Sequence, residues 1–125
     1  MKKYKILIVE DEPALLGALS SKFSKEEFEV AEARDGEEGL EKALAEHPDL
    51  ILLDIIMPKM DGMTMLERVR RDEWGKKVPV IILTNLTDDD KVEEAIKRGS
   101  HDYLIKSDWH INDVVVKVRN RLARR

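Results

Sequence analysis

The segment Leu50-Ile51-Leu52-Leu53-Asp54 is an unbroken apolar run that ends in a carboxylate. A second segment, Ile6-Leu7-Ile8-Val9-Glu10-Asp11, repeats this pattern near the start of the chain. Apolar side chains at every position, rather than at alternate ones, are typical of strands that are buried on both faces of a parallel sheet. The two segments therefore predict a parallel sheet whose strands end in acidic groups.

Three further short apolar runs lie elsewhere in the chain, at residues 28–31, 78–83 and 103–105. The run at 28–31 is the weakest, and the run at 78–83 gains strand character from its β-branched residues. Together with the first two segments, these runs predict five strands.

Amphipathic stretches separate the predicted strands, and several begin with helix-start signals. Pro13 suits the first turn of a helix, and Asp35 lies three residues before Glu38, as in a capping box. A further helix is expected between Thr87 and Gly99. The apolar positions expected to face the core are Leu15, Leu16, Leu19 and Phe23 in the first helix, Leu40, Ala43 and Leu44 in the second, Val92, Ala95 and Ile96 in the helix of residues 87–99, and Val114, Val115, Val118 and Leu122 in the last.

Strands that alternate with helices predict a βα unit repeated five times. Right-handed crossovers then require a parallel sheet with helices on both faces, which is an α/β fold. The chain contains no linker, internal repeat or low-complexity segment, so residues 1–125 are expected to form a single domain.

The composition narrows the class of protein. With 42% hydrophobic and 38% charged residues, the chain is typical of a globular domain, and its net charge of -4 argues against direct nucleic-acid binding by this domain. It has no cysteine, which excludes disulfides and thiol catalysis. No apolar run approaches the roughly 20 residues that span a bilayer. Acidic residues at 10–12 interrupt the first apolar run, so no secretory signal is expected and the cytoplasm is the predicted location.

Ligands of open parallel sheets bind beyond the carboxyl ends of the strands. The first predicted strand ends in Glu10 and Asp11, the third in Asp54, the fourth in Thr84 and the fifth in Lys106. These side chains are therefore expected to converge on one edge of the sheet.

This set of groups suits phosphoryl transfer. Clustered carboxylates repel each other, and Mg²⁺ would relieve that repulsion through oxygen ligands. Asp54 could then act as a nucleophile and form an aspartyl phosphate, with Mg²⁺ and Lys106 neutralising the phosphoryl oxygens. Thr84 would donate a hydrogen bond to the phosphoryl group only once it is attached, which could drive a conformational shift.

Over essentially the whole chain, these residues resemble the receiver domains of response regulators in two-component signalling. The pair Glu10-Asp11 is similar to the metal-binding acidic pair of that family. Asp54, followed by Met57-Pro58 and Asp61-Gly62, resembles the phosphoacceptor and its loop. The resemblance implies a flavodoxin-like fold with strand order 2-1-3-4-5, the order found in the chemotaxis regulator of this family.

The resemblance also implies roles for single residues. Thr84 and Lys106 match the switch hydroxyl and the lysine of the family. Tyr103 falls where the family has the aromatic residue that swings inward on activation. The backbone carbonyl of Ile56 would bind Mg²⁺ together with the carboxylates.

By resemblance, the chain would accept a phosphoryl group from the phosphohistidine of a sensor histidine kinase or a phosphotransfer protein. It would catalyse its own phosphorylation and dephosphorylation without turning over a separate substrate. Movement of Thr84 would open space for Tyr103 and reshape the face made by the helix of residues 87–99, the strand of residues 103–105 and the last helix. That face would bind an effector domain, a partner protein or a second receiver in a homodimer, with no membrane or direct nucleic-acid contact.

Three positions depart from the family pattern. Ser107 follows Lys106 where the family usually has a proline, often with a cis peptide bond. Because a cis bond before a residue other than proline costs about 3 kcal/mol, the Lys106-Ser107 bond is expected to be trans or strained. Glu10 replaces a more common aspartate, and Asn85 stands where a smaller residue is frequent.

Two other classes of function stay open. The first is an interaction module with the same fold that works without phosphorylation, which the departure at Ser107 keeps open. An enzyme for small phosphorylated substrates is less compatible, because Ile55 and Ile56 after Asp54 break the D-x-D-x-T signature of aspartyl-phosphate phosphatases. Nucleotide binding is weaker still, because no G-x-G-x-x-G or P-loop motif is present.

Overall fold

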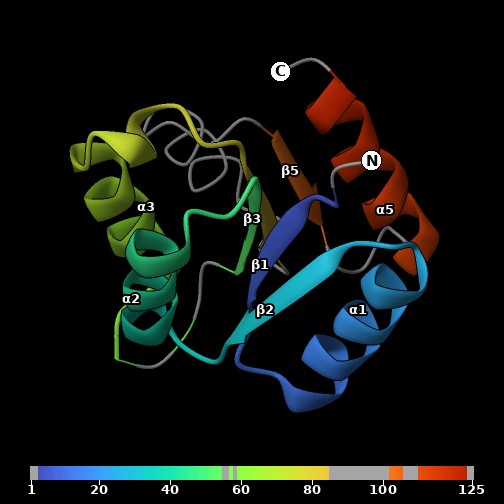
Figure 1. Ribbon diagram of the computed structural model, residues 1–125. Helices are drawn as coiled ribbons and strands as arrows, with labels where there is room; N and C mark the ends of the chain where they lie inside the picture. Colours follow the sequence, from blue (N-terminus) through green and yellow to red (C-terminus); the bar gives the residue numbers. More distant parts are fainter. Residues whose placement is uncertain (1–2, 55–56, 58, 85–101, 106–109, 124–125) are drawn as a thin grey trace.

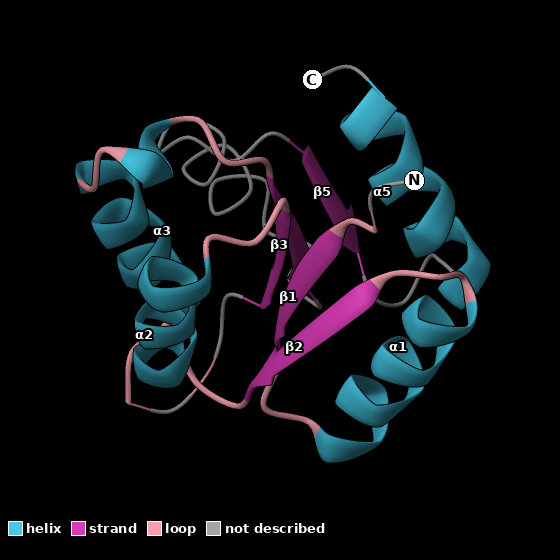
Figure 2. Cartoon of the chain, viewed as in Figure 1, coloured by secondary structure: helices cyan, strands magenta, loops and turns pink. Residues whose placement is uncertain are grey.

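The chain is described by a computed structural model that covers residues 3–54, 57, 59–84, 102–105 and 110–123, with backbone alone for residue 84 and residues 102–105. The helix expected between Thr87 and Gly99 lies outside these ranges. Figure 1 follows the chain and Figure 2 its secondary structure. The strands are β1 (Lys5–Val9), β2 (Glu29–Ala33), β3 (Leu50–Asp54), β4 (Val80–Thr84) and β5 (Asp102–Ile105). The helices are α1 (Pro13–Lys25), α2 (Gly36–Glu46), α3 (Gly62–Arg71) and α5 (Ile111–Ala123), with a short 3-10 helix η1 (Trp74–Lys76).

The five strands form one parallel sheet in the order β2-β1-β3-β4-β5. Helices α2 and α3 cover one face of the sheet, while α1 and α5 cover the other (Figure 1). The predicted α/β class, the flavodoxin-like strand order and the helices on both faces are confirmed. Bounds differ by a few residues, since β2 begins at Glu29 and continues to Ala33 instead of covering 28–31.

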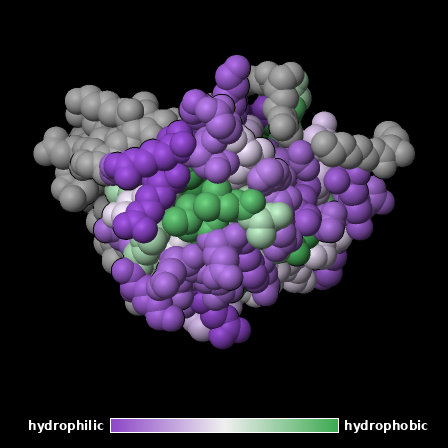
Figure 3. All heavy atoms as spheres, turned by 60° about the vertical axis from the view of Figure 1, so that its left-hand side comes forward, coloured by the Kyte–Doolittle hydropathy of each residue, from purple (hydrophilic) through white to green (hydrophobic). Residues whose placement is uncertain are grey.

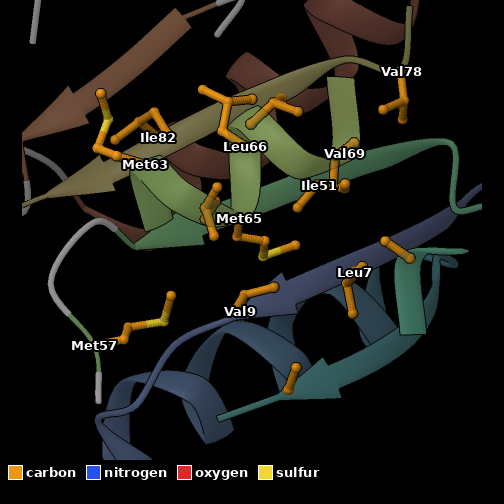
Figure 4. Packing of buried hydrophobic residues seen from close by; sticks show 14 residues of the cluster. Leu7, Val9, Ile51, Met57, Met63, Met65, Leu66, Val69, Val78 and Ile82 are labelled. Carbon is orange, nitrogen blue, oxygen red and sulfur yellow. The ribbon is translucent and has the colours of Figure 1, made fainter. Parts of the chain in front are cut away.

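Successive side chains of a strand point to opposite faces of the sheet. The apolar runs are unbroken because both faces are buried, so that every position must be apolar. Each central strand therefore supplies two separate cores, and Figure 4 shows part of the core on the α2 and α3 side. That core contains Leu7, Val9, Ile51, Leu53, Val80 and Ile82 from the strands. The core on the α1 and α5 side contains Ile6, Ile8, Leu50, Leu52, Ile81 and Leu83.

The helix starts follow the signals in the sequence. Pro13 occupies the first turn of α1. The Asp35 side chain accepts a hydrogen bond from the Glu38 backbone N–H at 2.8 Å, and Asp61 does the same for Thr64 at 2.8 Å. These bonds satisfy N–H groups that have no partner within a helix. None of the helices in the described ranges is long and apolar enough to cross a membrane.

The inward face of α2 differs in part from the prediction. Ala43 is buried and Leu40 packs against the core, but Leu44 is 38% exposed. Instead of Leu44, Gly36 and Gly39 are buried, because the backbone of α2 packs closely on its neighbours at these two residues. Figure 3 shows an apolar area ringed by hydrophilic side chains on the side of the molecule that carries α2 and α3.

The packing of α1 gives a test of the core on the α1 and α5 side. Phe23 is fully buried, and its ring meets that of Phe28 edge to face, with centroids 5.2 Å apart. Phe23→Ala should lower the free energy of unfolding by about 3–5 kcal/mol, because it leaves a cavity. Val116→Ala, on an exposed position of α5, should change it by no more than about 0.5 kcal/mol. Urea unfolding followed by circular dichroism measures both, and a similar small effect for the two variants would contradict the packing.

Candidate functional site

Three carboxylates from two neighbouring strands meet at the carboxyl edge of the sheet. Glu10 and Asp11 directly follow β1, and Asp54 is the last residue of β3, which pairs with β1. One carboxylate oxygen from each residue lies within 4.8 Å of the other two. The structure thus brings together the three acids that the sequence placed at this edge.

The three acids differ in their exposure to solvent. Glu10 and Asp54 are buried, with 1% and 5% of their surface exposed, whereas Asp11 is exposed. A Glu10 carboxylate oxygen accepts a hydrogen bond from the backbone N–H of Glu12 at 3.1 Å. This bond lowers the cost of burying the charge and orients the side chain. Glu12 was not among the residues predicted from the sequence, because a backbone donor leaves no signal in the type of residue.

Acids that follow strands often serve only as helix caps, but the acids of this cluster do not. The side-chain cap of α3 is Asp61, seven positions after Asp54, and the residue before α1 is Glu12, which makes no side-chain cap bond. Neither Asp11 nor Asp54 therefore stands at the capping position of the helix that follows it. Helix capping therefore does not explain why these two acids lie at the sheet edge.

The geometry of the cluster fits a hard divalent cation. Oxygens that bind Mg²⁺ at 2.0–2.1 Å lie about 2.9 Å apart when adjacent and about 4.1 Å apart when opposite. The limit of 4.8 Å between the carboxylate oxygens is close to these separations, so small side-chain rotations would allow them to share one ion. Because three carboxylates so close together repel, a bound dication would stabilise the arrangement.

Other predicted site residues lie on the next two strands. Thr84 is the last residue of β4, and the pairing of Asp54 with Leu83 places the Thr84 backbone one residue beyond Asp54 along the neighbouring strand. Tyr103 lies on β5, where it pairs with Ile82. The structure describes the backbone of Thr84 and Tyr103, so their predicted roles stay predictions.

The remaining predicted residues fall outside the described ranges. Lys106 follows directly on β5, which ends at Ile105. Ile56, Ser107 and Asn85 also lie outside, together with the proposed contribution of the Ile56 carbonyl and the Lys106-Ser107 bond. Met57 is described: it is buried in the core on the α2 and α3 side, and its side chain points toward that core in Figure 4.

A family model and related proteins both connect this chain with response regulators. A family model described as "Response regulator receiver domain" matches residues 6–119. The "DNA-binding dual master transcriptional regulator RpaA" of a Synechocystis species is 36% identical over 120 residues, which are 96% of this chain and 49% of that protein. This chain spans about half the length of such curated relatives.

Two solved structures extend the comparison to the fold. The receiver domain of the Francisella response regulator 1452 has a TM-score of 0.89 and 30% identity, covering 98% of both chains. A chain of the CheX-CheY-BeF₃-Mg²⁺ complex from Borrelia burgdorferi has a TM-score of 0.85 and 29% identity, covering 94% of this chain and 87% of that one.

The crowding of the carboxylates predicts that part of the cluster destabilises the metal-free protein. In a buffer with a chelator, Asp54→Asn should raise the free energy of unfolding by about 1–3 kcal/mol, because like charges about 5 Å apart repel by a few kcal/mol. Glu41→Gln, an exposed position on α2, should change it by no more than about 0.5 kcal/mol. Urea unfolding tests this, and an Asp54→Asn variant less stable than the wild type would contradict it.

Proposed function

This chain belongs to the response regulator receiver family of two-component signalling, and from that premise we propose that it is a switch phosphorylated on Asp54. The observation that carries the proposal is the carboxylate cluster of Glu10, Asp11 and Asp54 at the edge of the sheet. Two of these acids are buried at strand ends, where they contribute nothing to the apolar cores. Their placement is explained by chemistry at this edge.

Glu10, Asp11 and Asp54 would hold Mg²⁺, with the Ile56 carbonyl as a further ligand. When bound, the ion would neutralise charge on the oxygens of the incoming phosphoryl group. The CheX-CheY-BeF₃-Mg²⁺ complex from Borrelia burgdorferi supports this assignment, because BeF₃ is an analogue of a phosphoryl group.

Asp54 would act as the nucleophile. A carboxylate oxygen of Asp54 forms a bond to phosphorus while the N–P bond of a phosphohistidine breaks, and the electron pair of that bond returns to the imidazole. Lys106 would place its ammonium group against the phosphoryl oxygens. Water would later hydrolyse the acyl phosphate, which releases inorganic phosphate and returns Asp54 to a carboxylate. Because both steps would use the protein's own site residues, the protein would catalyse its own phosphorylation and dephosphorylation.

The output would come from a change in the face next to β4 and β5. Thr84 would donate its hydroxyl to a phosphoryl oxygen, and Tyr103 would move into the space that Thr84 leaves. The altered face, which by resemblance to the family would include residues 87–99 beside β5 and α5, would then bind an effector domain, a partner protein or a second receiver. The donor would be a sensor histidine kinase or a phosphotransfer protein.

The first experiment is phosphorylation by a small donor. With acetyl phosphate and Mg²⁺, intact mass spectrometry should show one added phosphoryl group, which disappears without Mg²⁺ and in Asp54→Asn. Asp61→Asn is the matched control, because asparagine also caps helices and that variant should still be labelled. Labelling of Asp54→Asn would exclude Asp54 as the acceptor. If neither acetyl phosphate nor BeF₃ modifies the wild type, the phosphorylation-independent interaction module becomes the better assignment.

The switch itself gives a separate prediction. Thr84→Ala should still be phosphorylated, but phosphorylation should shift the amide resonances of α5, such as that of Val116, much less than in the wild type. The reason is that the hydrogen bond formed only in the phosphorylated state is missing. Two-dimensional NMR with and without BeF₃ measures the shifts, and changes of full size in Thr84→Ala would rule out this coupling.

A further inference from the structure

Two glycines of α2 bring the helix unusually close to the segments that carry the acidic cluster. Gly36 and Gly39 are three residues apart, so they lie on the same side of the helix, and both are buried. A Cβ atom on Gly36 would lie 2.1 Å from the carbonyl oxygen of Met60. A Cβ atom on Gly39 would lie 2.9 Å from Cγ2 of Val9. Met60 and Val9 therefore occupy the space that a side chain at position 36 or 39 would need.

The two contacts involve the two segments of the chain that carry the carboxylates. Val9 is the last residue of β1 and directly precedes Glu10 and Asp11. Met60 belongs to the segment that joins β3, which ends at Asp54, to α3. One side of a single helix thus packs against the segment before the acidic pair and against the segment after the phosphoacceptor.

The contact between Gly36 and Met60 is made by backbone atoms, so it fixes the distance between the two backbones. The N–H of Gly36 donates a hydrogen bond to the Met60 carbonyl oxygen at 3.0 Å. Lys59 adds an ion pair with Asp35, with Nζ 3.7 Å from Oδ2, but the Lys59 side chain is 67% exposed. Exposed ion pairs contribute little, so the backbone bond and the close packing at Gly36 dominate.

From these contacts we propose that Gly36 is a positioning residue for phosphoryl transfer, an inference that rests on the function proposed above. It sets where the segment after Asp54 lies relative to Glu10 and Asp11 on β1. A side chain at position 36 collides with a backbone carbonyl, which cannot rotate away as a flexible side chain can. Met60 would then move away from α2, and Asp54, six residues earlier in the same connection, would lose its placement relative to Glu10 and Asp11.

Gly36→Ala tests the proposal against a matched control. Gly17→Ala makes the same chemical change in α1, where a Cβ atom would have no heavy atom within 4 Å. Mg²⁺ affinity and the rate of phosphorylation by acetyl phosphate are measured under conditions in which circular dichroism shows each variant to be folded. Gly36→Ala should weaken Mg²⁺ binding and slow phosphorylation by about tenfold, since a misplacement of about 1 Å can cost about a hundredfold. Gly17→Ala should leave both unchanged.

A measurement on the wild type keeps the inference testable if Gly36→Ala does not fold. The Gly36 amide resonance should shift when Mg²⁺ is added, because its acceptor lies in the segment that follows Asp54, while the Gly17 resonance should stay in place. A wild type that is phosphorylated, with Gly36→Ala behaving like Gly17→Ala or with a Gly36 resonance indifferent to Mg²⁺, overturns the role of Gly36 alone. A wild type that neither binds Mg²⁺ nor accepts a phosphoryl group overturns the proposed function, and this inference with it.

Discussion

The burial of the central strands on both faces is the constraint on which the rest of the structure depends. The β1 and β3 side chains alternate between two apolar cores, so neither strand can turn a face to solvent. Helices must then cover both faces, and each connection must return across the sheet before the next parallel strand begins. All strands consequently end at the same edge. The packing therefore brings together the acids that directly follow the apolar runs, although their segments are far apart in the sequence.

At that edge the same type of residue serves two purposes. Asp35 and Asp61 accept hydrogen bonds from backbone N–H groups three residues later and fix the starts of α2 and α3. Asp54 ends a strand well before the next helix, and its carboxylate is buried beside Glu10. Caps stabilise the fold, while crowded carboxylates oppose it. Such local conflicts with the rules of stability are concentrated at functional sites, which agrees with the role proposed for this cluster.

Helix α2 shows how stability and function are connected in this fold. Its buried glycines have a lower helix propensity than alanine would have at the same positions. In return, the helix approaches β1 and the segment after β3 more closely than any side chain would allow. A helix that carries none of the predicted site residues is in this way part of the frame around the site.

The sequence by itself determined the fold class, the sites of the strands and the acids at their ends, because these depend on local patterns of apolar and polar residues. The face of α2 was predicted only in part: the spacing of Leu40, Ala43 and Leu44 was visible, but the close approach at Gly36 and Gly39 was not. Likewise, nothing in the residue types indicated the bond from the Glu12 backbone to Glu10. Only the tertiary structure decided these features. The close approaches at Gly36 and Gly39 depend on which distant residues, Met60 and Val9, are brought against α2, and the bond to Glu10 depends on how the backbone turns before α1.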